Sequence, residues 1–217
     1  MVTALIFDMD GVIVDSTAIH TQAWRVYLNN HGLTVENLES RMLGKHNDEL
    51  VRDFFPADAL TGELIHQHGS RKEAVYRGLM SPVLEEKLVR GAREFIRGHC
   101  DRPLGVATNA EPDNVNFVLD AAGLRSCFRV IVDGHQVPRP KPFPDIYLEA
   151  ANLLGYAPGD CVVFEDSKTG VQAARSAGMR VVGVSTTLAE FVDVDLTVRD
   201  FFDPKLEPWL QEFTVSR

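Results

Sequence analysis

The sequence has 217 residues, of which 45% are apolar and 24% are charged, and its formal net charge at pH 7 is −9. This composition is ordinary for a soluble globular protein, and the length allows one large domain or a core domain with a smaller insertion. The acidic charge argues against a nucleic-acid partner, because phosphate backbones are bound by basic stripes and the sequence contains none. No apolar run approaches the roughly 20 residues of a membrane span, so we expect no membrane partner either.

The cysteines and the N-terminal residues indicate the cellular compartment of the protein. The 3 cysteines are odd in number and show no C-x-x-C spacing, which is typical of a reducing cytosol. No signal-peptide pattern opens the sequence, and Met1 is followed almost at once by a predicted strand. We therefore expect a cytoplasmic protein that is a monomer or a weak dimer.

The first predicted element is a strand at residues 4–7, an apolar run of the kind that is buried on both faces of a sheet. After Ser16 the spacing of apolar residues becomes helical, and no convincing strand follows up to residue 80. Helices are expected near residues 19–31, 33–43, 47–55 and 61–80, with stops at Gly32, Gly44, Pro56 and Ser81. Because this block separates the first strand from the rest of the chain, we interpret it as an inserted helical cap.

From residue 81 onward, predicted helices and strands alternate. Strands are expected at residues 104–107, 129–132, 161–164, 180–184 and 196–198, and helices at residues 91–98, 113–122, 143–154 and 168–177. Alternation of this kind predicts an α/β fold with a parallel, doubly wound sheet. The predicted domains are a core of residues 1–16 and 81–217 and a helical cap of residues 17–80.

Polar residues follow the predicted strands at their carboxyl ends, which is where open α/β sheets bind ligands. In strand order these residues are Asp8 and Asp10, then Thr108 and Asn109, then Asp133, Gly134, Arg139 and Lys141, and finally Glu165 and Asp166. The sequence therefore brings carboxylates, a hydroxyl and a lysine to one edge of one sheet.

The first of these groups indicates a metal. Asp8 and Asp10 are two residues apart and point to the same side of an extended chain, so their carboxylates can converge. They would repel each other without a cation, and hard oxygen ligands suit Mg²⁺. Gly11 allows a sharp turn and lets a ligand approach the main chain closely. Taken alone, this pattern is equally compatible with two solvated aspartates in a turn.

The whole set fits phosphoryl transfer through an aspartyl-phosphate. Asp8 would attack the phosphorus, and Asp10 would protonate the leaving alcohol and later deprotonate the attacking water. The predicted Mg²⁺ ligands are Asp8, the main-chain carbonyl of Asp10, and Asp166, with Glu165 as a further candidate. For Glu165 and Asp166, the alternative is an acidic pair that interacts with a helix macrodipole.

Two further groups would contact the phosphoryl oxygens. Thr108 and the amide of Asn109 would bind them, and Lys141 would neutralise the charge that spreads over them in the transition state. Each has a structural alternative: Thr108 and Asn109 could cap a helix, and Lys141 could be a surface lysine in a proline-rich turn. Their joint occurrence, in order and each at a predicted strand end, is hard to assign to chance.

Four segments of the sequence resemble, in order, the four motifs of the haloacid dehalogenase-like (HAD) superfamily. They are Asp8-Met-Asp10-Gly11-Val12, Val106-Ala107-Thr108-Asn109, Lys141-Pro-x-Pro-Asp145 and Phe164-Glu165-Asp166-Ser167. The match spans nearly the whole chain and looks most like the β-phosphoglucomutase/phosphatase branch. It implies a Rossmann-like core, a helical cap that closes over the site, and dependence on Mg²⁺. Asp10 argues against dehalogenases and phosphonate hydrolases, which lack an acid at that position.

The same resemblance extends to the predicted cap. His20 and Trp24 look like the start of a mutase cap, and Lys72 lies about where a cap lysine would help to exclude water. Asn47 stands where the resemblance would place an arginine. The predicted substrate-binding residues are therefore Asp8, Asp10, Gly11, Thr108, Asn109, Lys141, His20, Trp24, Lys72 and Asn47.

The choice between a phosphatase and a mutase depends on a second anion pocket. A mutase needs one for the phosphate that is not being transferred, yet Asn47 and Glu111 occupy positions where the resemblance implies cations. A glutamate there should repel a bisphosphate if it is partly buried, although Arg52, Arg71 or Lys45 could supply the positive charge instead. We therefore expect a Mg²⁺-dependent phosphatase acting on a small phosphorylated metabolite, with a β-phosphoglucomutase-type mutase as the alternative. A catalytically idle binding protein is a third reading.

Overall fold

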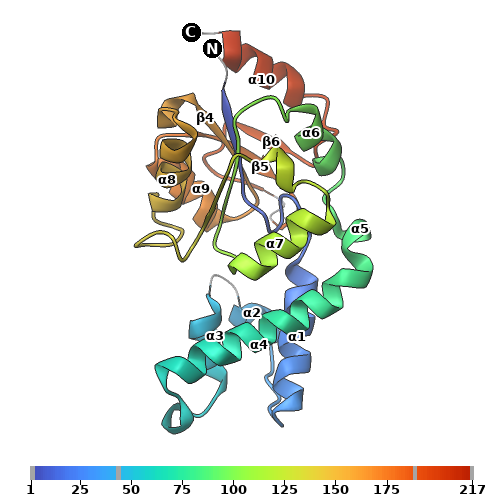
Figure 1. Cartoon of the computed structure of the whole chain (residues 1–217), viewed down its shortest axis with the longest axis vertical. Coiled ribbons are helices and arrows are strands. Elements are labelled where there is room, and N and C mark those ends of the chain that lie inside the picture. Colours follow the sequence, from blue (N-terminus) through green and yellow to red (C-terminus); the bar gives the residue numbers. More distant parts are fainter. Residues whose placement is uncertain (1–2, 43–44, 188–189, 216–217) are drawn as a thin grey trace. The chain divides into compact units, whose positions relative to one another are not determined.

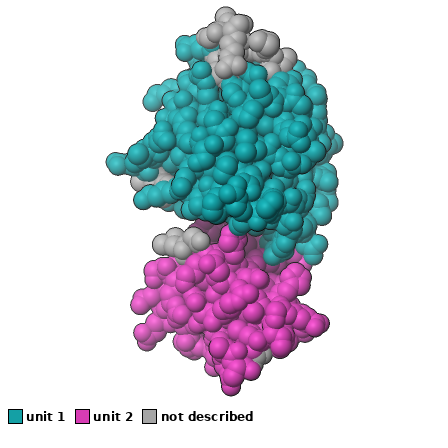
Figure 2. Space-filling view, turned by 90° about the vertical axis from the view of Figure 1, so that its left-hand side faces the viewer, with its two compact units in different colours: residues 1–15, 84–217 teal, residues 16–83 magenta. Residues whose placement is uncertain are grey.

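A computed structural model describes residues 3–42, 45–187 and 190–215 (Figure 1). Contacts divide the chain into two compact units, which Figure 2 shows in different colours. The core unit comprises Met1–Asp15 and Leu84–Arg217, and the helical unit comprises Ser16–Val83. The predicted boundaries lie after residues 16 and 80, and the function of the helical unit as a cap stays a prediction.

The core unit contains one six-stranded parallel sheet with the order β3-β2-β1-β4-β5-β6. The strands are β1 (Ala4–Phe7), β2 (Leu104–Thr108), β3 (Val130–Asp133), β4 (Cys161–Glu165), β5 (Arg180–Val184) and β6 (Leu196–Val198). The central strand β1 is fully buried and pairs with β2 on one side and β4 on the other. The predicted α/β fold with a parallel sheet is confirmed, and the strand order reverses direction at β1 and β4, where such folds bind ligands.

Helices cover both faces of this sheet. Besides short turns, the core unit has α5 (Leu84–Lys87), α6 (Ala92–Gly98), α7 (Pro112–Ala121), α8 (Asp145–Leu154), α9 (Lys168–Ser176) and α10 (Leu206–Val215). Alternate strand residues such as Ala4 and Ile6 pack with α8 and α9, which lie together in Figure 1. The opposite face carries an aromatic cluster in which Phe7 stacks on Phe164 at 4.6 Å between ring centroids. The sheet is therefore packed between two apolar layers, one on each face.

The helical unit is built around two longer helices, α1 (Thr17–Asn30) and α4 (Gly62–Met80), with α2 (Leu38–Met42) and α3 (Asn47–Phe54) beside them. Its apolar core includes Trp24, Leu28 and Val51. Thr61 is the N-cap of α4, because its side chain accepts a hydrogen bond from the amide of Leu64 at 3.2 Å. Of the described residues in this unit, none belongs to a strand, as predicted.

Some element boundaries differ from the prediction. The helix predicted at residues 33–43 begins only at Leu38, because Asn37 has a positive φ of 53° that interrupts a right-handed helix. Its predicted end at Leu43 and Gly44 lies outside the described residues. Helices α5 and α10 were not predicted. Pro208 in the first turn of α10 is compatible with a helix start, which the sequence analysis did not recognise.

Cys100 and Cys127 form a disulfide, a pairing that the cysteine spacing did not predict. The end of α6 and the turn before β3 bring their Cα atoms to 4.8 Å, within the range that a disulfide spans. An odd number of cysteines leaves one unpaired, and this is the buried Cys161. Among the residues that the structure describes, no helix is long and apolar enough to span a membrane.

Candidate active site

Three buried carboxylates meet at the carboxyl end of the central strands. Asp8 follows β1, Glu165 ends β4 and Asp166 comes next, and one ligand oxygen from each lies within 4.8 Å of the others. The register explains this meeting: Phe7 pairs with Phe164, and the amide of Asp8 donates to the carbonyl of Phe164 at 3.0 Å. Parallel strands in this register place successive residues of β1 and β4 side by side.

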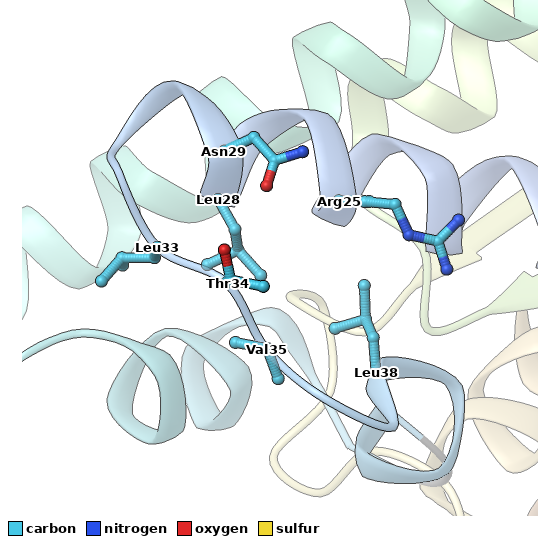
Figure 3. Close-up of a pocket in the computed structure, with 7 residues that line it drawn as sticks. All are labelled: Arg25, Leu28, Asn29, Leu33, Thr34, Val35 and Leu38. Carbon is cyan, nitrogen blue, oxygen red and sulfur yellow. The ribbon is translucent and has the colours of Figure 1, made fainter.

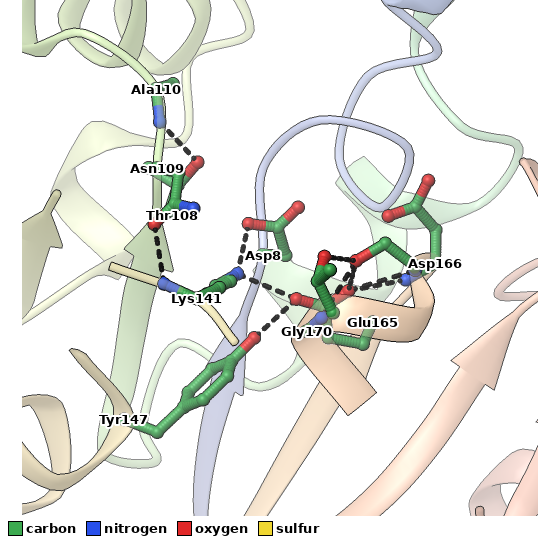
Figure 4. A network of polar contacts seen from close by, with 11 residues as sticks. Asp8, Thr108, Asn109, Ala110, Lys141, Tyr147, Glu165, Asp166 and Gly170 are labelled. Carbon is green, nitrogen blue, oxygen red and sulfur yellow. Dashed lines mark hydrogen bonds and ion pairs between the residues drawn. The ribbon is translucent and has the colours of Figure 1, made fainter. Parts of the chain in front are cut away.

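Lys141 reaches this cluster from the loop between β3 and α8 (Figure 4). Its Nζ donates to Oδ1 of Asp8 and to Oε1 of Glu165, each at 2.7 Å. The Lys141 amide donates to Oδ1 of Asn109 at 3.3 Å, so the loop is also held to the end of β2. Thr108 is buried, and its Oγ1 accepts a hydrogen bond from the Ala110 amide at 3.2 Å. The residues predicted from four separate strand ends therefore gather in the core unit.

Glu165 is the most fully hydrogen-bonded member. Its Oε1 accepts from Lys141 and from the Tyr147 hydroxyl, the latter at 2.6 Å. Its Oε2 accepts from the Asp166 amide and from the amide and hydroxyl of Ser167, at 3.0, 3.1 and 3.0 Å. A Cβ at Gly170 would lie 1.7 Å from Oε1, so only glycine leaves room for this carboxylate. Both oxygens of Glu165 are therefore engaged by protein donors.

The electrostatics of the cluster show an excess of negative charge. Burial, together with the charges of Glu165 and Asp10, raises the pKa of Asp8 to about 7, although Lys141 opposes the shift. Burial and the charges of Glu165 and Asp8 raise the pKa of Asp166 to about 8. Glu165 is also buried, but Lys141 and the hydrogen bonds lower its pKa. Lys141 and the other donors keep Glu165 ionised, whereas Asp8 and Asp166 would need a further cation to be ionised together.

These residues fit a divalent metal ion. Carboxylate oxygens are the donors that Mg²⁺ prefers, and Asp8 and Asp166 are the two carboxylates whose raised pKa values a cation would lower. Gly11 leaves space beside them, because a Cβ there would lie 1.8 Å from Oδ2 of Asp166. Asp10 lies on the adjoining turn and its side chain is not part of the three-carboxylate cluster, so its predicted role through the main-chain carbonyl stays a prediction.

The predicted residues of the helical unit also gather, around a carboxylate that the sequence analysis did not select. Lys72 Nζ lies 3.0 Å from Nδ1 of His20 and donates to Oε1 of Glu73 at 2.7 Å. Asn47 Nδ2 donates to the same Glu73 oxygen at 2.7 Å. The Lys72 ammonium lies 5.3 Å from the ring centroid of Trp24. These contacts lie within one unit, and the substrate-binding role of its residues stays a prediction.

Comparison with known proteins identifies the family. The sequence pattern of the haloacid dehalogenase-like hydrolases matches residues 2–178. This chain belongs to that family. The predicted resemblance is therefore confirmed at the level of the family.

Relatives of the hydrolase include both a phosphatase and a mutase. It is 35% identical over 183 residues to the fructose-1-phosphate phosphatase of Escherichia coli, covering 83% of this chain and 95% of that protein. It is 30% identical over 223 residues to the β-phosphoglucomutase of Bacillus subtilis, covering 99% and 96%. The crystal structure of a β-phosphoglucomutase from Clostridium difficile matches with a TM-score of 0.83, at 24% identity and covering 99% and 98% of the two chains, which shows the shared fold.

A small hollow of about 190 Å³ lies in the helical unit of the hydrolase, between α1 and α2 (Figure 3). It is lined by Arg25, Leu28, Asn29, Leu33, Thr34, Val35 and Leu38. None of the predicted site residues lines it, and its walls are largely aliphatic. The candidate active site of the hydrolase is therefore the carboxylate cluster and not this hollow.

Three residues around the cluster were missed by the sequence analysis. Tyr147 is on α8, and no sequence pattern indicates that its hydroxyl contacts Glu165 at the end of β4. Thr187 donates to Oδ2 of Asp166, and Thr186 donates to the carbonyl of Gly11. Both threonines follow β5, so the rule that polar residues at strand ends form the site would have found them had it been applied to that strand.

Proposed function

We propose that this hydrolase is a Mg²⁺-dependent phosphatase that acts on a small phosphorylated metabolite of the sugar phosphate class. The observation that carries the proposal is the cluster of Asp8, Asp166 and Lys141, which combines two carboxylates in need of a cation with a buried ammonium. A nucleophilic carboxylate beside positive charge is what transfer of a phosphoryl group through a covalent intermediate requires. The relatives that act on phosphorylated sugars support the substrate class.

The reaction has two steps. A carboxylate oxygen of Asp8 attacks the phosphorus, the phosphorus–oxygen bond of the ester breaks, and Asp10 gives its proton to the leaving alcohol. Water then attacks the phosphorus of the aspartyl-phosphate and loses a proton to Asp10, and inorganic phosphate leaves as the Asp8 carboxylate is restored. Thr108 and the amide of Asn109 bind the phosphoryl oxygens during both steps.

Two groups balance the negative charge of the substrate. We assign the metal to Asp8, the main-chain carbonyl of Asp10, and Asp166; when bound, Mg²⁺ would screen the repulsion between the carboxylate and the phosphate. Glu165 was also predicted as a ligand, but both of its oxygens accept hydrogen bonds, so we assign it to holding Lys141. Lys141 neutralises charge on the phosphoryl group in the transition state.

Hydrolysis is favoured over isomerisation by the charges at two positions. Asn47 is neutral, and its side chain donates to Glu73. Burial would raise the pKa of Glu73, but the charges of Lys72 and His20 and the hydrogen bonds from Lys72 and Asn47 lower it to about 2. Glu111, where a mutase should bind an anion, pairs instead with His135 at 2.8 Å. Both positions therefore lack the positive charge that would hold a second phosphate.

A phosphate-release screen tests the proposal. The purified protein is incubated with a panel of phosphorylated metabolites, with Mg²⁺ and with EDTA. We expect Mg²⁺-dependent release of inorganic phosphate, with sugar phosphates among the best substrates. Absence of release from every compound would overturn the phosphatase assignment, and an isomerisation assay then distinguishes a mutase from an idle binding protein.

The second candidate is a β-phosphoglucomutase-type mutase, which the match over nearly the full length of the Bacillus subtilis enzyme favours. Conversion of hexose 1-phosphate to hexose 6-phosphate is measured with an added bisphosphate, in parallel with phosphate release. Rapid isomerisation with little free phosphate would overturn the phosphatase assignment.

A further inference from the structure

Tyr147 contacts both members of the ion pair between Lys141 and Glu165. It lies on α8 and its side chain is fully buried. Its hydroxyl donates to Oε1 of Glu165 at 2.6 Å, and this oxygen also accepts from Lys141 at 2.7 Å. Its ring lies under the ammonium, with 4.8 Å between Lys141 Nζ and the ring centroid. Figure 4 shows the tyrosine, the lysine and the glutamate converging from α8, the preceding loop and β4.

These contacts restrict a side chain that is otherwise flexible. A lysine ammonium is a compact charge on a stem with several rotatable bonds, so its position depends on what surrounds it. The aromatic face attracts the ammonium, and the hydroxyl fixes the glutamate oxygen to which the ammonium is bonded. The other oxygen of Glu165 is already held by Asp166 and Ser167. Movement of Lys141 away from Asp8 would therefore break contacts on two sides.

We propose that Tyr147 is a positioning residue that holds the Lys141 ammonium on Asp8 through its ring and through Glu165. The inference rests on the proposed function, because the held ammonium is the group that stabilises the transferring phosphoryl group. Tyr147 touches neither the substrate nor Asp8 in this assignment. It acts by limiting where Lys141 can lie when the negative charge on the phosphoryl oxygens develops.

The hydroxyl can be separated from the packing of the ring. Tyr147→Phe keeps the buried ring against the core and keeps the aromatic face under Lys141, but it removes the donor to Glu165. Tyr156→Phe is the matched control, because Tyr156 packs against the same apolar cluster and takes no part in the Glu165 network. A role in packing alone predicts that the two variants behave alike.

Kinetics provide the first test. For Tyr147→Phe we expect kcat to fall by about tenfold or more while KM changes less than about twofold, because the loss is confined to the transition state. Adding Tyr147→Phe to Lys141→Ala should slow the enzyme no further, since the group being positioned is already gone. If the two effects multiply in the double variant, or if kcat equals that of the control, the proposal is overturned.

A second test does not depend on turnover. Heteronuclear NMR of labelled lysine ammonium groups should show a slowly exchanging signal that Lys141→Ala removes. We expect this signal to be broadened or lost in Tyr147→Phe and retained in Tyr156→Phe. An unchanged signal in Tyr147→Phe would contradict the positioning role even if the enzyme were slow. If the wild type releases no phosphate from any compound, the proposed function fails, and the NMR result still decides whether Tyr147 holds Lys141.

Discussion

Each unit of the molecule buries one lysine beside carboxylates, and the two clusters differ in their charge. In the core unit, Lys141 bonds to Asp8 and Glu165, with Asp166 beside them. In the helical unit, Lys72 bonds to the single carboxylate of Glu73, and His20 lies 3.8 Å from that carboxylate. Both lysines are almost completely buried, so their surroundings decide the charge of each cluster.

The pKa shifts follow this difference. In the helical unit the nearby cations outweigh burial, and the pKa of Glu73 falls to about 2. In the core unit, burial and mutual repulsion outweigh Lys141, and the pKa values of Asp8 and Asp166 rise to about 7 and about 8. In a balanced cluster each charge has a partner, whereas a cluster with excess negative charge is suited to bind a cation or to react.

The largest expected effect comes from changing the nucleophile. Asp8→Asn should reduce kcat on p-nitrophenyl phosphate at least about ten-thousandfold, because no carboxylate remains to form the covalent intermediate. The same change removes one negative charge from the excess, so the thermal midpoint should not fall. Activity and thermal unfolding are measured on the same preparation. The exposed Asp120→Asn is the control, and appreciable turnover by Asp8→Asn would refute the nucleophile assignment.

The balanced cluster is tested by removing its ammonium. Lys72→Met leaves Glu73 buried without its main partner, so we expect the free energy of unfolding to fall by about 3–5 kcal/mol. Arg71→Met, at the exposed neighbouring position, serves as the control. Urea denaturation measures both variants. A loss no greater than that of the control would show that the cluster is not held by its charges.

The dependence on pH gives a second measurement on this variant. Glu73 has a folded pKa of about 2 against an ordinary value of 4.5, so its contribution to stability is present above pH 4.5 and is lost as the pH falls towards about 2. In Lys72→Met the pKa of Glu73 should rise, and this acid-side loss should shrink.

Magnesium should act on the core cluster. At a concentration of one hundred times its dissociation constant, Mg²⁺ should stabilise the wild type by about 2.7 kcal/mol. Lys72→Met should gain as much from Mg²⁺ as the wild type does, because its defect lies in the other cluster. Asp166→Asn should gain much less. Equal stabilisation of Asp166→Asn and the wild type, measured by thermal unfolding with Mg²⁺ and with EDTA, would place the ion elsewhere.

Much of this arrangement could be predicted from the sequence, because it depends on local patterns. Short apolar runs identified the strands, and the parallel fold then required the residues after β1 and β4 to meet. Asp8, Lys141 and Asp166 were predicted together for this reason. The start of α2 was missed, since the left-handed conformation at Asn37 leaves no trace in the spacing of apolar residues.

Contacts between distant side chains were not predictable in the same way. The pairing of Cys100 with Cys127 depends on how α6 and the turn before β3 approach each other. Similarly, Glu73 is an ordinary acidic residue on an amphipathic helix until α1 and α3 bring His20 and Asn47 against it. Such residues acquire their roles from tertiary packing, and no spacing rule indicates them in advance.

The smallest effect is expected from changing Thr187. This change tests whether binding of a cation by the core cluster depends on residues outside the three carboxylates. Its hydroxyl donates to Oδ2 of Asp166 and so orients a predicted metal ligand from the end of β5. Thr187→Val keeps the shape of the side chain and removes the donor, and we expect Mg²⁺ to bind about tenfold more weakly, as is usual when a partner of a metal ligand is lost. Thr197→Val on the exposed side of β6 is the control. Calorimetric titration with Mg²⁺ measures both. The hydroxyl also opposes the raised pKa of Asp166, so it should favour the ionised form that binds Mg²⁺. An unchanged affinity in Thr187→Val would mean that the carboxylates of the core cluster bind the ion without support from the residues after β5.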